Sequence, residues 1–141
     1  MAAPEYILAL DYGERRVGVA IAHTIARLPH PLTTLTNSET LLTDITQLVL
    51  REHAGLVIVG LPRGMDGGYT DQTRAAEAFA DKLRGVLEVP VALADETLTS
   101  VDAEASLPYQ KNRPKGDIDA MAASLILERY LVDHPAGEVR A

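Results

Sequence analysis

The stretch ILALDYGERRVGVAIA, residues 7–22, decides the fold because it holds two apolar runs separated by a short polar turn. The first run ends in Asp11, and Gly13 permits the positive φ of a tight turn. The second run contains Gly18 where a side chain would otherwise stand. A glycine inside a strand is typical of a place where something approaches the backbone closely. These residues therefore predict two strands, with an acidic side chain at the end of the first.

The rest of the chain first continues as a strand and then alternates helical periodicity with short apolar runs. Three strands without intervening helices predict an antiparallel meander, and the alternating part predicts parallel strands with crossover helices. The expected class is α/β, with a mixed five-stranded sheet and helices on both faces. The expected strands are residues 6–11, 17–22, 31–35, 56–60 and 89–95. The expected helices are residues 38–53, with Ser38 as N-cap, 71–87, 99–107 and 118–131, and a polar loop occupies 108–117.

Length and composition predict one globular domain spanning residues 1–141, with a frayed tail at 132–141. The chain is 47% hydrophobic, which excludes disorder, and it contains no cysteine for a disulfide or thiolate metal site. No signal peptide or membrane-spanning run is recognised, so a cytoplasmic protein is expected. The net charge of −7 argues against nucleic-acid binding unless the basic side chains are segregated.

Acidic residues stand where the chain geometry could bring them together. Asp11 ends the first strand, Glu96 follows the fifth, and Asp119 lies in the first turn of the last helix. Carboxylates held together repel one another, and a hard divalent cation, Mg²⁺ or Mn²⁺, is the usual compensation. Asp119→Asn is therefore expected to leave metal-free stability unchanged or raised. Spacing alone leaves Asp95 as an alternative to Glu96, and Asp117 could simply be a helix N-cap.

A glycine-rich segment follows the fourth strand at the same predicted end of the sheet. Its backbone N–H groups could bind phosphates, although a mobile connector is the simpler interpretation. The glycines concerned are Gly60, Gly64, Gly67 and Gly68.

Four ordered motifs resemble the YqgF family, also named RuvX, whose members are similar to the Holliday-junction resolvase RuvC. They are LDYGERRVGVA at 10–20, VIVGLPRGMDG at 57–67, DETLTS at 95–100 and KGDIDAMAASLILERYL at 115–131. The resemblance spans nearly the whole chain. It implies an RNase H-like fold and a metal-dependent nuclease that matures the 5′ end of small-subunit ribosomal RNA or cleaves branched DNA.

The resemblance also implies roles for particular residues. The family's catalytic acids fall on Asp11, Glu96 and Asp119, with Asp11 bridging two ions and the other two each binding one. Lys115 matches a recurring basic position before the last helix. The arginine usual after the Asp-Glu pair is replaced by Thr97, which puts the strength of substrate binding in doubt.

Binding of a polyanion would require a basic rim around the carboxylates. The expected rim is Arg15, Arg16, Arg63, Arg74, Lys111, Arg113 and Lys115. Two alternatives stay open. The first is an ATP-binding module of the actin and sugar-kinase type, whose first phosphate loop is also a strand, Asp, x, Gly turn. The second is a non-catalytic ribosome-assembly factor. The expected oligomeric state is a monomer or homodimer.

Overall fold

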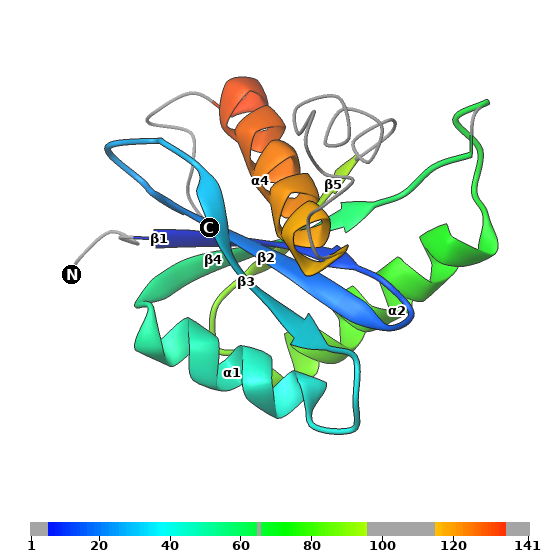
Figure 1. The fold of residues 1–141 in the computed structure, drawn as a ribbon, viewed down its shortest axis with the longest axis horizontal. Coiled ribbons are helices and arrows are strands. Elements are labelled where there is room, and N and C mark those ends of the chain that lie inside the picture. The colour runs from blue at the N-terminus through cyan, green and yellow to red at the C-terminus, as the bar shows by residue number, and fades with distance from the viewer. Residues whose placement is uncertain (1–5, 65, 96–114, 135–141) are drawn as a thin grey trace.

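The computed structural model describes residues 6–64, 66–95 and 115–134 and contains a mixed sheet between two layers of helices (Figure 1). The strands are β1 (Tyr6–Tyr12), β2 (Arg16–His23), β3 (His30–Thr36), β4 (Ala54–Leu61) and β5 (Val91–Asp95). The helices are α1 (Leu41–Arg51), α2 (Asp71–Val86) and α4 (Lys115–Asp133). No helix within these ranges is long and apolar enough to cross a membrane.

The sheet has the strand order β3-β2-β1-β4-β5. The pairs β1–β2 and β2–β3 are antiparallel, whereas β1–β4 and β4–β5 are parallel. The predicted meander followed by parallel strands is therefore confirmed. Because β1, β4 and β5 run in one direction, their C-terminal ends meet at one side of the sheet, which we call the carboxyl edge.

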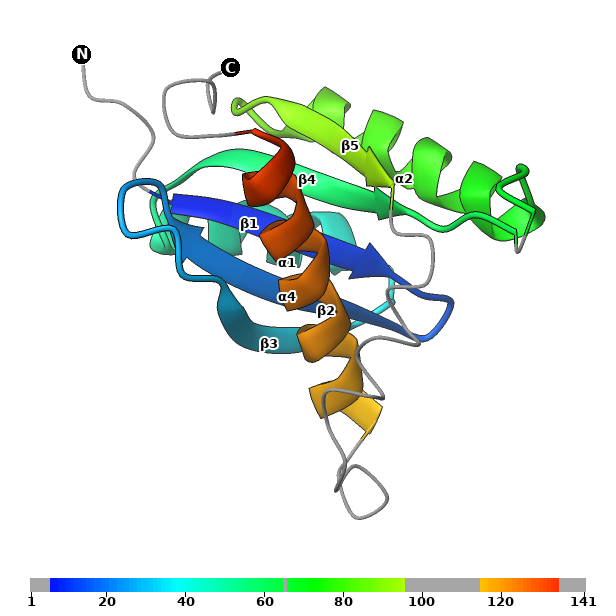
Figure 2. The same cartoon turned by 90° about the horizontal axis from the view of Figure 1, so that it is seen from above.

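Helices cover both faces of the sheet, as predicted (Figure 2). Alternate strand residues such as Leu8 and Leu10 pack with α1 and α2 in the larger core cluster. The intervening residues, such as Ile7 and Ala9, pack against α4 in a second cluster. This period-two alternation decides which side chains at the carboxyl edge face α4.

Helix α4 is fixed to the sheet at two points. Near its start, a Cβ atom on Gly18 would lie 2.8 Å from the Ala120 backbone nitrogen and closer still to the Asp119 carbonyl. The expectation that Gly18 permits a close approach is thereby confirmed, and the approaching group is the α4 backbone. Near its end, Arg27 donates to the carbonyl oxygens of Leu131 (2.6 Å) and His134 (2.7 Å). The position of α4 is therefore set by β2 and by the turn that follows it.

Two helix starts differ from the sequence prediction. Helix α1 begins at Leu41 with Thr40 as N-cap, because Ser38 forms a preceding turn in which its carbonyl accepts the Leu41 N–H at 3.1 Å. Helix α4 begins at Lys115, so the loop prediction is wrong over residues 115–117. The helix tolerates Gly116 because tertiary packing of a long helix outweighs the roughly 1 kcal/mol cost of one glycine.

The earlier start of α4 changes the position of Asp119, which is the fifth helical residue and lies beyond the first turn. Asp117 is also helical and is not an N-cap. At the other end, α4 continues to Asp133, two residues into the expected tail. The predicted helix at 99–107 lies outside the described residues.

Candidate active site at the carboxyl edge

Asp11 reaches the carboxyl edge on the face of the sheet that α4 covers. In the β1–β2 ladder it stands opposite Gly18. Residues directly opposite one another in an antiparallel pair point to the same face. Since the α4 backbone packs on Gly18 at Asp119, the register places Asp11 and Asp119 on one side of the sheet, next to the same glycine. Asp11 and the backbone of Asp119 therefore adjoin one glycine, while a shared cation site for their side chains remains a prediction.

Asp119 is held by an arginine from a strand more than 100 residues earlier in the chain. The Arg16 Nε donates to Asp119 Oδ2 at 2.7 Å. The two side chains are 38% and 27% exposed, so the ion pair is partly shielded from water. The sequence prediction did not include this contact, because no local pattern links the start of β2 to α4.

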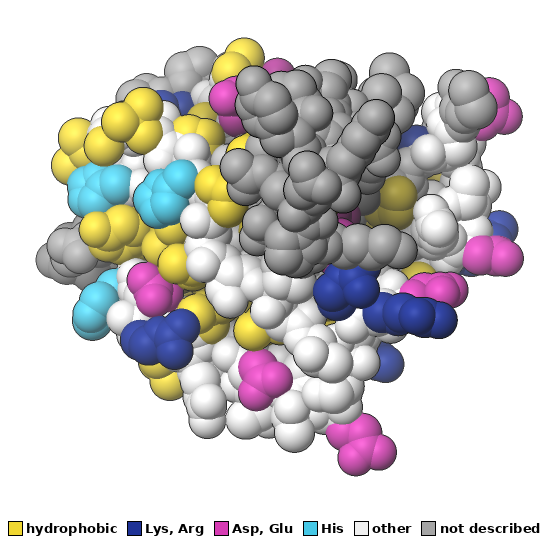
Figure 3. Space-filling model, in the orientation of Figure 1, with side chains coloured by type: hydrophobic (Ala, Val, Ile, Leu, Met, Phe, Trp, Pro, Cys, Tyr) yellow, Lys and Arg dark blue, Asp and Glu magenta, His cyan; other side chains and the backbone are white. Residues whose placement is uncertain are grey.

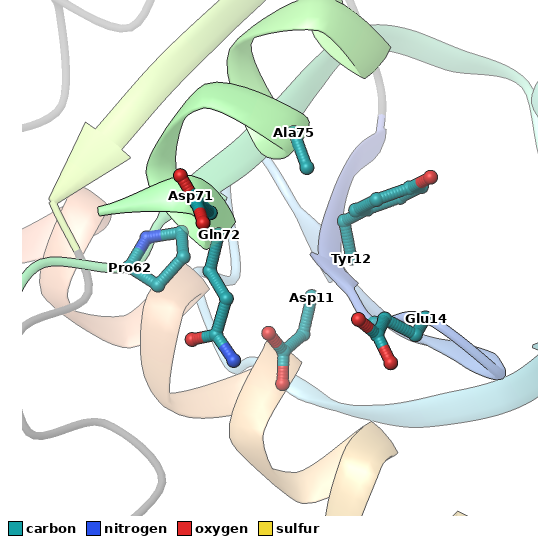
Figure 4. Close-up of a pocket in the computed structure, with 8 residues that line it drawn as sticks. Asp11, Tyr12, Glu14, Pro62, Asp71, Gln72 and Ala75 are labelled. Atoms are coloured by element: carbon teal, nitrogen blue, oxygen red, sulfur yellow. The ribbon is translucent and has the colours of Figure 1, made fainter. Parts of the chain in front are cut away.

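Asp11 also lines a cleft of about 290 Å³ between the β1–β2 turn and the start of α2. In Figure 4, Gln72 and Glu14 lie on either side of Asp11. The cleft therefore has polar groups next to Asp11 and a partly apolar wall. The full lining is Asp11, Tyr12, Gly13, Glu14, Pro62, Asp71, Gln72 and Ala75.

The sequence prediction did not include the other polar residues that line this cleft. In the sequence, Asp71 and Gln72 have the pattern of an ordinary helix start, and Glu14 has that of a turn residue. Their common signal is position, because the β1–β2 turn and the helix after β4 both lie at the carboxyl edge of a parallel pair. Tyr12 stacks on Phe79 of α2 with ring centroids 4.3 Å apart, which ties the β1 end to that helix.

The end of β5 helps to decide whether Asp95 or Glu96 faces the same side of the sheet as Asp11. Ala92 and Ala94 pack on the α4 side, and Leu93 packs on the opposite side. Strand alternation therefore places Asp95 on the same face of the sheet as Leu93, which is opposite to the face of Asp11. Glu96 lies outside the described residues, so its predicted role remains a prediction. Within the described ranges, no group of three acidic or histidine side chains is arranged to hold a metal ion.

The glycine-rich segment after β4 is a folded turn that uses its own amides. Gly64 N–H donates to the Gly68 carbonyl (2.9 Å), Gly67 N–H to the Gly64 carbonyl (2.8 Å), and Gly68 N–H to Asp66 Oδ1 (2.8 Å). Gly60 is a strand residue paired with Ala94 in the β4–β5 ladder. In this conformation these three N–H groups donate to acceptors within the turn, so phosphate binding by the glycines stays a prediction that would require the turn to rearrange.

Side chains brace the same turn. Arg63 lies over the Tyr69 ring, 4.6 Å from its centroid, and Tyr69 is half exposed. The Tyr69 hydroxyl donates to Glu77 Oε2 of α2 at 2.9 Å. This hydrogen bond, followed by the charge of Glu77, raises the pKa of Tyr69, while the charge of Arg63 lowers it by less. Arg63 is therefore part of the internal structure of the turn.

The described members of the predicted basic rim come from the β1–β2 turn, the start of β2, the turn after β4 and the first turns of α2 and α4, and three of them have acidic or aromatic partners. Arg15 is exposed in the β1–β2 turn. Arg16 pairs with Asp119, Arg63 stacks on Tyr69, and Arg74 pairs with Asp71 at 3.1 Å. On the face in Figure 3, dark-blue basic side chains lie next to one another at the lower right and adjoin magenta acidic ones. Lys115 is the first residue of α4, whereas Lys111 and Arg113 lie outside the described residues.

The turn that carries Arg15 is held from the β3 side. Asn37 Nδ2 donates to the Gly13 carbonyl (2.7 Å), and Asn37 N–H donates to the Arg15 carbonyl (2.9 Å). These two hydrogen bonds fix the backbone directly after Asp11. Asn37 is a site-supporting residue that the sequence pattern did not indicate.

A comparison with protein families matches residues 5–133 to a model described as RuvX, Holliday junction resolvase. The chain is 44% identical over 132 residues to a Chloroflexus aurantiacus protein and 45% identical over 130 residues to a Chloroflexus aggregans protein. Both are named "Putative pre-16S rRNA nuclease". The first alignment covers 90% of this chain and 86% of the C. aurantiacus protein. The second covers 89% of this chain and 92% of the C. aggregans protein.

Solved structures confirm the fold at low sequence identity. T. thermophilus RuvC, solved in complex with a Holliday junction substrate, is 15% identical with a TM-score of 0.54, covering 93% of this chain and 97% of that one. The fowlpox virus Holliday junction resolvase is 13% identical, also with a TM-score of 0.54, covering 91% and 98%. The predicted RNase H-like α/β fold is confirmed.

Proposed function

The chain belongs to the RuvX family and is a nuclease of that family, and on this premise we propose that it is a cation-dependent phosphodiesterase whose substrate is the precursor of 16S ribosomal RNA. The observation that supports the proposal is that two acidic residues, from β1 and from α4, both adjoin Gly18. Asp11 stands opposite Gly18 in the sheet, and the backbone of Asp119 packs on Gly18.

The side chains at this point suit a hard divalent cation. Asp11 and Asp119 offer only carboxylate oxygens, the ligand type that Mg²⁺ and Mn²⁺ prefer. We propose that these two residues hold the cation, with Glu96 as a further ligand. When bound, such a cation activates the attacking water and stabilises the leaving oxygen in phosphodiester cleavage.

The residues around the carboxylates would position the polynucleotide. Arg15 is exposed in the turn that follows β1 and would bind a backbone phosphate. In the cleft, Glu14 and Gln72 would hydrogen-bond a nucleotide, and the apolar side of Tyr12 would contact its sugar or base. The net charge of −7 is compatible with this arrangement only if Arg15 and the basic side chains at 111–115 dominate the field at the substrate path.

The names of the most similar relatives described above favour RNA as the substrate. The relatives that are 44% and 45% identical over about nine-tenths of the chain carry the pre-16S rRNA name. The junction resolvases are only 13–15% identical, so their similarity supports the fold and not the substrate. The proposal implies a cytoplasmic enzyme, as the sequence analysis predicts.

The proposed substrate is tested by single-turnover cleavage with Mg²⁺ or Mn²⁺. An RNA that contains the 5′ precursor segment of 16S rRNA is compared with a four-way DNA junction at the same enzyme excess. The RNA should be cleaved at least about tenfold faster. Faster cleavage of the junction would make the chain a resolvase, and cleavage of neither, together with saturable ATP–Mg²⁺ binding, would favour the nucleotide-binding alternative.

A further inference from the structure

We propose that Arg16 is a positioning residue that fixes the orientation of the Asp119 carboxylate toward the cation. This inference rests on the proposed function, since it concerns a ligand of the proposed cation site. It also replaces the sequence-based interpretation of Arg16 as a contact to the nucleic-acid backbone.

The first support is the direction of the Arg16 side chain. Strand alternation puts Arg16 on the same face as Gly18, which is the face that α4 covers. Arg16 lies two positions before Gly18, and Gly18 stands opposite Asp11. Arg16 is therefore a diagonal neighbour of Asp11, with Cα atoms roughly 7–8 Å apart in such pairs. Its guanidinium contacts Asp119 on the same face of the sheet as Asp11.

The second support is the contact itself. Arg16 Nε donates to Asp119 Oδ2 at 2.7 Å, within the short range of charge-assisted hydrogen bonds. The two side chains, 38% and 27% exposed, are shielded more than the other Arg–Asp pairs along α2, where Asp71 and Asp81 are largely exposed. A partly shielded, short contact between distant segments restricts the rotamers of both side chains.

The third support is that the Arg16 backbone is itself fixed. Arg16 pairs with Thr36 in the β2–β3 ladder. A Cβ atom on Gly13 would lie 2.6 Å from the Arg16 carbonyl, so the turn is tightly closed, and Asn37 bonds to the carbonyls of Gly13 and Arg15. An arginine on a rigid strand end can orient its partner, whereas one on a mobile loop could not. Gly18 thus sets the backbone of Asp119 and Arg16 sets its side chain.

Hydrogen bonds to a carboxylate ligand determine how well that ligand binds a metal ion. Removal of such a partner typically costs 10–100-fold in metal affinity or activity. A phosphate-binding arginine would behave differently, because its loss lowers affinity for nucleic acid and leaves metal affinity unchanged in the absence of nucleic acid. Metal binding by the protein alone therefore separates the two roles.

The test compares Arg16→Gln with Arg16→Met by calorimetric titration of the full chain with Mn²⁺, without nucleic acid. Both variants are uncharged at position 16 and nearly equal in length. The amide nitrogen of glutamine stands at the same point along the side chain as the arginine Nε, so glutamine keeps a donor there and methionine has none. We expect Arg16→Met to bind Mn²⁺ about 10–100-fold more weakly and Arg16→Gln to stay within about threefold of the wild type.

Two results would overturn the inference. Unchanged or tighter Mn²⁺ binding by Arg16→Met would show that Arg16 does not position a ligand, and equal weakening of both variants would show that the donor is not what matters. If Arg16→Met fails to melt cooperatively, Arg16→Ala serves as the variant without a donor. Adding Arg16→Met to Asp119→Asn should produce no further loss, because the partner is already changed.

Asp119→Asn separates failure of this inference from failure of the proposed function. If Asp119→Asn binds Mn²⁺ like the wild type, Asp119 is not a cation ligand and the proposed site is wrong. If Asp119→Asn weakens binding while Arg16→Met does not, the cation site stands and only the role of Arg16 is refuted.

Discussion

The backbone of Asp119 packs against Gly18 so closely that any Cβ atom on residue 18 would overlap its carbonyl group. This contact explains why the buried strand β2 contains a glycine at position 18. It also places a helix that enters from a distant part of the sequence beside the end of β1, where Asp11 stands. A contact that serves packing thereby determines the geometry of the proposed active site.

Gly18→Ala should destabilise the fold by about 1–3 kcal/mol, because the added methyl group forces α4 away from the sheet. The matched control is Gly85→Ala near the end of α2, where an added Cβ would meet nothing within 4 Å. That substitution should stabilise by roughly 0.5–1 kcal/mol. Urea unfolding of both variants provides the measurement. Equal effects of the two substitutions would contradict the close packing of α4 on Gly18.

Asp119→Asn should lower metal-free stability by about 0.5–1 kcal/mol, since it breaks a partly shielded ion pair with Arg16. The sequence analysis predicts unchanged or raised stability, because it includes the repulsion among carboxylates but not the ion pair with Arg16. Asp81→Asn is the control, because Asp81 pairs with Arg84 at 2.9 Å on an exposed helix face. Its effect should stay within about 0.5 kcal/mol. A metal-free Asp119→Asn protein as stable as the wild type would show that repulsion outweighs the ion pair.

The titration of Tyr69 should respond to Glu77. The Glu77 carboxylate accepts a hydrogen bond from the phenol O–H and so favours neutral Tyr69, which raises its pKa above the ordinary value. Glu77→Gln should therefore lower the pKa of Tyr69. Because the raised pKa belongs to the folded state, the contribution of this contact to stability is present at neutral pH and is lost as pH rises through the titration. Ultraviolet difference titration against Tyr69→Phe isolates the signal, and no shift on Glu77→Gln would refute the contact.

Arg15→Ala should weaken binding of RNA of any sequence and reduce the slope of log affinity against log salt by about 1, as expected for one lost phosphate contact. Arg51→Ala is the comparison, because Arg51 is also exposed but ends α1 near the start of β4, on the far side of the sheet. Its salt slope should equal that of the wild type. Fluorescence anisotropy over a salt series measures both, and identical slopes for the two variants would remove Arg15 from the interface.

The local pattern of the sequence was sufficient for the strand order of the meander, the crossover helices and the acidic end of β1. Strand periodicity and the lack of helices between the first three strands are short-range signals. The contacts of Arg16 with Asp119 and of Asn37 with Gly13 were not predictable, because they join segments far apart in the chain and depend on how α4 and β3 pack. The internal hydrogen bonds of the glycine-rich turn were also not predictable, because composition does not show which amides have acceptors.

Single-turnover cleavage of an end-labelled 16S precursor RNA shows whether Asp11 belongs to a cation-dependent nuclease site. The wild type and Asp11→Asn are compared with Mg²⁺, with Mn²⁺ and with excess chelator, after circular dichroism has shown that both are folded. We expect cleavage by the wild type only with added cation, and a loss of at least about 1,000-fold in the Asp11→Asn rate constant, because the substitution removes a charged ligand oxygen. Equal rates for the two proteins, or wild-type cleavage that persists in chelator, would contradict it.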